Sequence, residues 1–196
     1  MRNGMTDLVA SFRTYVYESG TAIFSNDAIE ALLDNNRIQI VGQPLGYNPY
    51  PVGGTTTYTN AYLPYKWLEG TASGTALVRV TTNLGTVVTN YQSDIYNGQF
   101  TFDINTKGTA YYYTGRAYNF YKAVSEGWFI KAGYYAGNFD FRVEGRQFNK
   151  SQVYKQFLDM RDYYSRLADS TFGTIERGDY LGNMENLNAS TNYITF

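Results

Sequence analysis

The stretch AIEALLDNNRIQIV, residues 28–41, contains the point at which the spacing of apolar residues along the chain changes. Ile29 and Leu33 are one helical turn apart, and Ser25 ahead of them is a favoured N-cap residue. A run of polar residues then interrupts the pattern, and residues 38–41 have the apolar, β-branched composition of a strand. The chain therefore passes from a helical part to a β-rich part here, which predicts an α+β fold.

The chain before this point is predicted to form another helix. Leu8, Phe12 and Val16 recur at every fourth position, so residues 5–18 should be helical. A glycine follows this run and interrupts it. We therefore expect residues 5–36 to fold as a helical hairpin.

The chain after this point is predicted to be a β-module. Residues 38–113 are rich in Thr, Gly, Asn and Tyr and show little helical periodicity. Strand-like runs at 75–81 and 86–89 flank the turn sequence Asn83-Leu84-Gly85, which is typical of a hairpin. Residues 98–104 alternate apolar and polar side chains. These patterns predict a small antiparallel β-module inserted between two helical parts.

Helical spacing returns near Ala117 and continues to Tyr135, and a short strand is expected within residues 139–145. Asn149 is a candidate N-cap for a last helix. The apolar residues of that helix have the 4-3-4-3 spacing of a seam that packs on another helix: Val153, Phe157, Met160, Tyr164 and Leu167.

The predicted architecture is thus α+β, with a four-helix core made of the helical hairpin and the two later helices. Residues 1–37 and 114–169 would form this core, with residues 38–113 as the inserted antiparallel β-module. Residues 170–196 carry isolated apolar side chains without any period, so they are predicted to be an extended C-terminal arm. Such a segment either folds back on its own chain or buries its apolar side chains on a partner, and we predict that it binds a partner.

Composition argues against an enzyme. The chain has no cysteine and no histidine, which removes thiolate metal sites and the most common general base. Asp140 and Glu144 lie on one side of a strand with Arg142 between them, and we interpret them as a solvated face. We expect no catalytic residue, no cofactor and no metal site. The start of the chain lacks the apolar region of a signal peptide, so synthesis in the cytoplasm is expected.

Charge and tyrosine content indicate a protein that binds other proteins. The net charge is -1, with 16 basic and 17 acidic residues, and no basic run suggests tight binding of nucleic acid. The chain has 21 tyrosines, which suit half-buried strands and are also enriched at protein interfaces. No long apolar run predicts a membrane-spanning helix.

The order of these parts, together with several short motifs, resembles the head-to-tail adaptor (connector) proteins of tailed bacteriophages. The motifs are the sequence FDFRVEGR at residues 139–146, the helix start KSQ at 150–152, the run RDYYSRLA at 161–168 and the helix start FSNDAI at 24–29. Lys150 stands where the family pattern has an arginine. The resemblance covers residues 5–37 and 114–169.

The resemblance implies a structural virion protein of the neck, between head and tail. It would form a homo-oligomeric ring, often of twelve subunits, beneath the portal protein and above a tail or neck protein. Genomic DNA would pass through the lumen without specific binding. The arm would then bind the portal protein or a neighbouring subunit through five residues: Tyr180, Leu181, Tyr193, Ile194 and Phe196.

Other functions fit parts of the sequence. Another protein of the same neck, such as a tail-completion protein, would be separated from an adaptor only by its assembly context. A carbohydrate-binding or adhesive β-module would use aromatic platforms such as Tyr111-Tyr112-Tyr113, although Trp67 and Trp128 lie in different predicted parts of the chain. A hydrolase with a carboxylate pair lacks a convincing constellation of residues.

Overall fold

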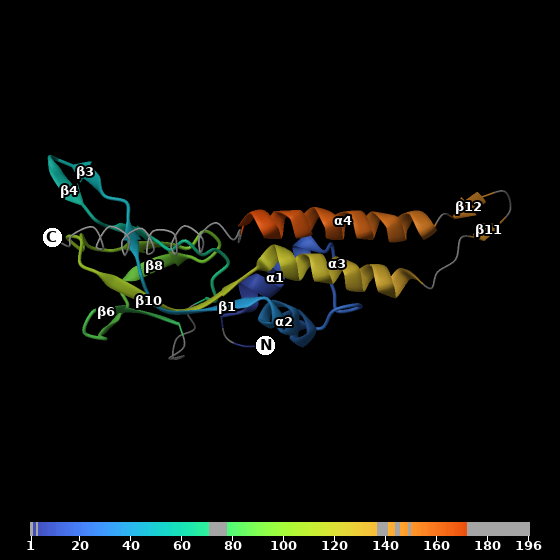
Figure 1. The fold of residues 1–196 in the computed structure, drawn as a ribbon, viewed down its shortest axis with the longest axis horizontal. Coiled ribbons are helices and arrows are strands. Elements are labelled where there is room, and N and C mark those ends of the chain that lie inside the picture. Colours follow the sequence, from blue (N-terminus) through green and yellow to red (C-terminus); the bar gives the residue numbers. More distant parts are fainter. Residues whose placement is uncertain are drawn as a thin grey trace, which may run out of the picture.

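The computed structural model describes residues 2, 4–70, 78–136, 141–143, 146–148 and 150–171. Four helices are described: α1 (Thr6–Tyr15), α2 (Asn26–Asn35), α3 (Phe120–Ala136) and α4 (Lys150–Thr171). The molecule is elongated, with most strands gathered at one end and α3 and α4 running side by side towards the other (Figure 1). As predicted, Ser25 caps α2, because its hydroxyl oxygen accepts a hydrogen bond from the backbone N–H of Ala28 at 3.1 Å.

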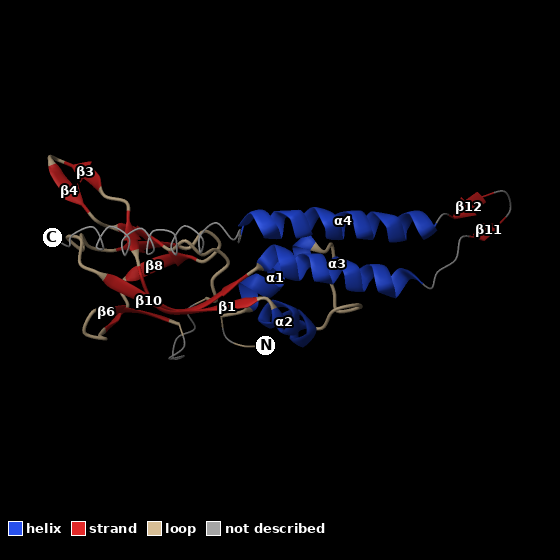
Figure 2. Cartoon of the chain, viewed as in Figure 1, coloured by secondary structure: helices blue, strands red, loops and turns tan. Residues whose placement is uncertain are grey.

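The described strands pair in antiparallel sheets (Figure 2). One four-stranded sheet has the order β1 (Arg37–Pro44), β10 (Tyr111–Tyr118), β6 (Arg79–Thr82), β7 (Val87–Val88). The other has the order β2 (Gly46–Tyr47), β5 (Asn60–Tyr62), β9 (Gln99–Phe102), β8 (Tyr91–Asp94). Two hairpins stand apart: β3 (Tyr50–Val52) with β4 (Thr55–Thr57), and β11 (Phe141–Val143) with β12 (Arg146–Phe148).

The two four-stranded sheets share one apolar cluster. Ile40, Val80 and Tyr113 come from the first sheet, and Phe100 and Phe102 come from β9 in the second. In β9 the burial alternates strictly along the strand, so that both phenylalanines lie on the buried face. The β-rich part of the chain therefore has a core of its own.

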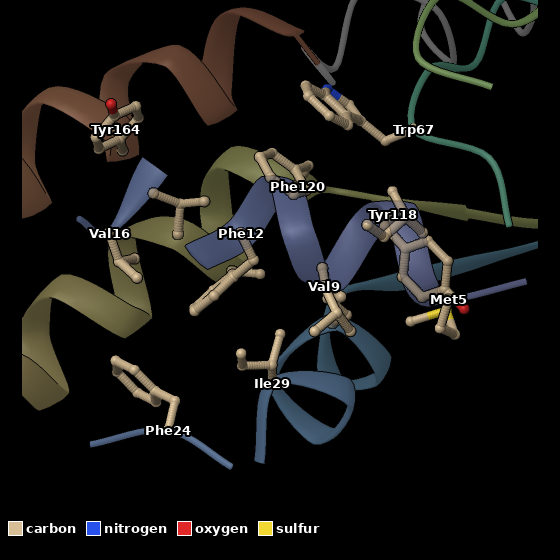
Figure 3. Packing of buried hydrophobic residues seen from close by; sticks show 14 of the residues in the cluster. Met5, Val9, Phe12, Val16, Phe24, Ile29, Trp67, Tyr118, Phe120 and Tyr164 are labelled. Carbon is tan, nitrogen blue, oxygen red and sulfur yellow. The ribbon is translucent and has the colours of Figure 1, made fainter. Parts of the chain in front are cut away.

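A second apolar cluster lies among the helices (Figure 3). Phe12 of α1 is fully buried, and its ring meets Phe24 edge to face at 5.7 Å between centroids. Two members come from the β-rich part, namely Trp67, which follows β5, and Tyr118 at the end of β10. Trp67 stacks on Phe120 of α3, with the ring centroids 3.8 Å apart. The β-rich part is thus joined to the helices through shared core residues.

The predicted four-helix core is therefore wrong. Strands dominate the core, and the helical cluster itself includes Trp67 and Tyr118 from the β-rich part. Among the described side chains of α4, only Tyr164 and Ala168 are buried. The reason is that α4 packs mainly along α3 on one side, so its seam residues Phe157, Met160 and Leu167 are only partly buried. Whether residues 38–113 fold as a separate unit stays a prediction.

The helical pattern predicted to start at Ala117 begins three residues later. Ala117 lies in β10, where it pairs with Ile38 of β1 and bridges to Leu68. Its backbone groups are therefore engaged by strands, and α3 begins at Phe120. The candidate cap Asn149 and the candidate strand residues 75–77 lie outside the described residues.

No helix of the described residues is long and apolar enough to cross a membrane.

Candidate functional site

The five residues predicted to bind a partner, Tyr180, Leu181, Tyr193, Ile194 and Phe196, lie outside the described residues, as do Asp140 and Glu144. The described residues contain no group of three or more acidic side chains that could hold a metal ion. One surface feature of the described residues is an exposed apolar face on α3, where three large side chains lie together.

This face, which we call the outer face of α3, consists of Phe129, Ile130, Gly133 and Tyr134. The side chains of Phe129, Ile130 and Tyr134 are 56%, 43% and 64% exposed. A Cβ atom placed on Gly133 would meet no atom within 4 Å, so the surface is open at this position. A second helix or strand has room to lie against it.

The opposite side of α3 is buried. Trp128 and Ala132 face the helical cluster, where the ring of Trp128 lies 5.4 Å from that of Phe157 in α4. Lys131 is also buried, and its Nζ donates hydrogen bonds to the backbone carbonyl oxygens of Val16 and Tyr17 at 2.7 and 3.2 Å. These carbonyl groups lie at the C-terminal end of α1, where the helix dipole favours a positive charge.

The inward turn of Lys131 leaves the outer face without charge. Lys131 is the only charged residue between Gly127 and Ala136. Burial lowers the pKa of its ammonium group, and the carboxylate of Glu18 partly opposes this effect. A helix that is apolar on all sides is normally buried on all sides. The outer face therefore has the properties of a surface that a partner covers.

Paired charges border this face. The guanidinium of Arg161 in α4 lies 5.7 Å from the ring centre of Phe129 and forms an ion pair with Asp162 at 2.6 Å. An apolar, aromatic centre with a polar rim is the usual arrangement of a protein–protein interface.

Sequence reasoning missed these residues. The apolar spacing predicted from Ala117 to Tyr135 includes Trp128 and Ala132, which are buried, but it gave no indication that the outer residues form a site. A usable signal was present, because residues 127–136 contain a single charged residue in almost three helical turns.

The tyrosine platform suggested for a carbohydrate site is interrupted. Tyr113 is buried against Phe100, while Tyr111 and Tyr112 are half-buried. Trp67 stacks on Phe120 and is 7% exposed. Neither Tyr113 nor Trp67 offers an open ring face on which a sugar could stack.

A buried charge network joins the β-rich part to the helices. The carboxylate of Glu69 is 7% exposed and accepts a hydrogen bond from the Tyr118 hydroxyl at 2.8 Å. Arg116 of β10 donates to the same oxygen at 3.3 Å. Arg2 lies 3.8 Å from the other oxygen and donates to both oxygens of Asp34 in α2 at 2.7 and 2.8 Å. The network links the start of the chain, α2 and β10, and its role is structural.

Ionisation of two buried tyrosines should make the stability of the fold depend on pH in the alkaline range. Burial raises the pKa of Tyr113 and of Tyr118, and for Tyr118 the hydrogen bond to Glu69 adds to the rise. The folded protein thus holds these protons more tightly than the unfolded chain, whose tyrosines have a pKa of about 10. The contribution of these protonated tyrosines to the free energy of unfolding is complete below that pH and is lost as the pH rises above it. We expect unfolding above about pH 10, measured by circular dichroism.

Phenolate absorbance recorded in the same titration follows the buried pair. Tyr113 and Tyr118 should lose their protons only as the protein unfolds, so part of the rise in absorbance should coincide with the loss of structure. Tyr113→Phe should move the unfolding to higher pH, because its hydroxyl is buried without a hydrogen-bond partner among the described residues. Ionisation of all tyrosines in one step without loss of structure would contradict this assignment.

No family model, no curated protein and no solved structure matches this chain.

Proposed function

We propose that this protein is a structural assembly protein of a tailed bacteriophage, a head-to-tail adaptor that forms a homo-oligomeric ring beneath the portal protein. The observation that carries the proposal is the uncharged outer face of α3, with Phe129, Ile130 and Tyr134 exposed. The motif resemblance of residues 5–37 and 114–169 supports the adaptor role.

In this proposal the outer face of α3 packs against a neighbouring subunit. A ring closes when one surface of each subunit meets a different surface of the next. The elongated shape suits this arrangement, because the α3–α4 pair extends away from the two four-stranded sheets and presents its length to a neighbour (Figure 1). The chain would act by joining capsid to tail, without catalysis.

The near-neutral charge suits a ring through which DNA passes. Each cationic contact to a phosphate adds affinity and slows movement of the duplex. A net charge of -1 and the absence of a basic run fit a lumen that does not hold DNA. The C-terminal arm, with Tyr180 and Phe196, would bind the portal protein.

The double variant Ile130→Glu, Tyr134→Glu tests the proposal. Both side chains are exposed, so the fold should tolerate the change, while two charges in a buried subunit contact should abolish assembly. We expect rings for the native chain and monomers for the variant, measured by light scattering after gel filtration and by electron microscopy.

Leu84→Glu is the matched control, because Leu84 is 87% exposed and lies in the turn between β6 and β7. This variant should assemble like the native chain, and circular dichroism should show all three proteins folded. A native chain that stays monomeric both alone and with portal protein would overturn the proposal. So would rings formed by the double variant.

A further inference from the structure

A groove of about 530 Å³ lies where α1, α3 and α4 meet the β-rich part. It is separate from the outer face of α3. The side chains that give it its character are four aromatic rings, a lysine and a leucine: Tyr15, Trp67, Tyr96, Tyr121, Lys66 and Leu167.

Aromatic rings form the apolar surface of the groove. Trp67 lines the groove, although it is itself only 7% exposed, and it meets Tyr15, Tyr96 and Tyr121 edge to face, with centroid distances of 6.2, 5.3 and 5.8 Å. The stacking on Phe120 fixes the Trp67 ring from behind. Such a rigid aromatic surface binds apolar side chains with little loss of conformational entropy.

A cation lies at the edge of this surface. Lys66 is exposed and takes part in no ion pair among the described residues. A neighbouring cavity of about 440 Å³ is lined instead by Asp7 and Asp94. An apolar segment with a negative charge would therefore be drawn to the groove at Lys66 and repelled from the acidic cavity.

The chain itself provides such a segment beside the groove. Leu167 of α4 lines the groove, and the helix ends at Thr171, one turn further on. The sequence continues as FGTIE over residues 172–176, with two large apolar side chains followed by a glutamate. Over residues 172–196 the chain has three acidic residues and one basic residue. The place of this segment directly after α4 and its charge both match the groove.

We infer that the groove binds residues 172–176 of the same chain, with Phe172 and Ile175 against the aromatic rings and Glu176 beside Lys66. Attachment to α4 makes the binding intramolecular, at an effective concentration in the millimolar range, so even a weak contact is populated. The arm beyond Arg177, which carries Tyr180 and Leu181, then starts from a fixed point on the subunit surface. This inference does not rest on ring formation.

Disulfide trapping in the full-length chain tests the inference. The native chain has no cysteine, so the double variant Lys66→Cys, Glu176→Cys contains only the two introduced thiols. Under mild oxidation we expect an intramolecular disulfide, which is seen as a faster-migrating monomer on a denaturing, non-reducing gel and as a mass loss of about 2 Da by mass spectrometry.

The control pair is Leu84→Cys with Glu176→Cys. Leu84 is exposed, so a thiol at this position is accessible, but it lies outside the groove. This pair should form the intramolecular disulfide at least about ten-fold more slowly, since its thiols lack the local concentration of the bound state. Equal rates for the two pairs would overturn the inference. A covalent dimer as the main product would show that the segment binds a neighbouring copy, which also overturns it.

Limited trypsin digestion gives a second readout without new thiols. Binding of residues 172–176 should protect the adjacent Arg177 from cleavage. In Lys66→Glu, the side chain at position 66 repels Glu176 instead of attracting it, so the segment should leave the groove. Cleavage after Arg177 should then be about five-fold faster or more. Lys155→Glu, an exposed lysine of α4 outside the groove, is the matched control and should leave the rate unchanged. Equal cleavage rates for Lys66→Glu and the native chain would contradict the inference.

Discussion

Glu69→Ala is expected to lower the free energy of unfolding by about 3–5 kcal/mol, the usual effect of removing one partner from a buried charge network. The carboxylate is 7% exposed and is held by Arg116, Arg2 and the hydroxyl of Tyr118. Its removal leaves the guanidinium of Arg116, itself 15% exposed, without its anion. Urea denaturation followed by circular dichroism measures the change.

Asp162→Ala is the matched control for this variant. Asp162 also forms an ion pair with an arginine, but the two side chains are 48% and 36% exposed, so water replaces the lost contact. We expect a change of about 0–1 kcal/mol, as for other exposed ion pairs. An equal, small effect of Glu69→Ala and Asp162→Ala would show that Glu69 is not structurally important.

Phe120→Ala is expected to cost about 3–5 kcal/mol, because it removes a fully buried aromatic ring and leaves a cavity. The ring stacks on Trp67 and meets Tyr15 and Tyr121 edge to face at 5.3 and 6.0 Å. Fluorescence of Trp67 should change as well, since its stacking partner is lost. Denaturant midpoints and emission spectra measure the two effects.

Phe157→Ala provides the comparison within the same cluster. Phe157 was predicted to belong to a core seam, but it is only partly buried between Trp128 and Tyr135. The expected loss is therefore smaller, about 1–2 kcal/mol, in proportion to the apolar area that is buried. If Phe157→Ala proves more destabilising than Phe120→Ala, the helical cluster is not centred on the junction with the strands.

Glu69 and Phe120 act at the same place in the molecule. Glu69 links the start of the chain to β10 through ion pairs, and Phe120 packs against Trp67 through apolar contact. Together they hold the α3–α4 pair in a fixed position relative to the sheets. In a ring, such a junction would transmit the position of the strands to the subunit contact proposed on α3.

The sequence by itself determined the local elements. The spacing of Leu8 and Phe12 predicted α1, and both side chains are buried. Ser25 marked the start of α2, because a cap acts through a backbone N–H only three residues away. The hairpin around Leu84 and the alternation in β9 were also predicted, since both depend on neighbours in the chain.

Only the tertiary structure decided where the core lies. Ala117 fits a helical stripe in the sequence and Tyr118 follows it, yet both residues are in β10, because they pair with Ile38 and Arg37 of β1. Trp67 belongs to the helical cluster although it is surrounded by β-rich sequence.

The candidate surfaces were also decided by long-range packing. Lys131 turns inward because the carbonyl oxygens at the end of α1, more than a hundred residues earlier, accept its hydrogen bonds. That contact leaves the outer face of α3 without charge. Periodicity and caps report on neighbours within a few residues, whereas burial depends on which distant segments meet.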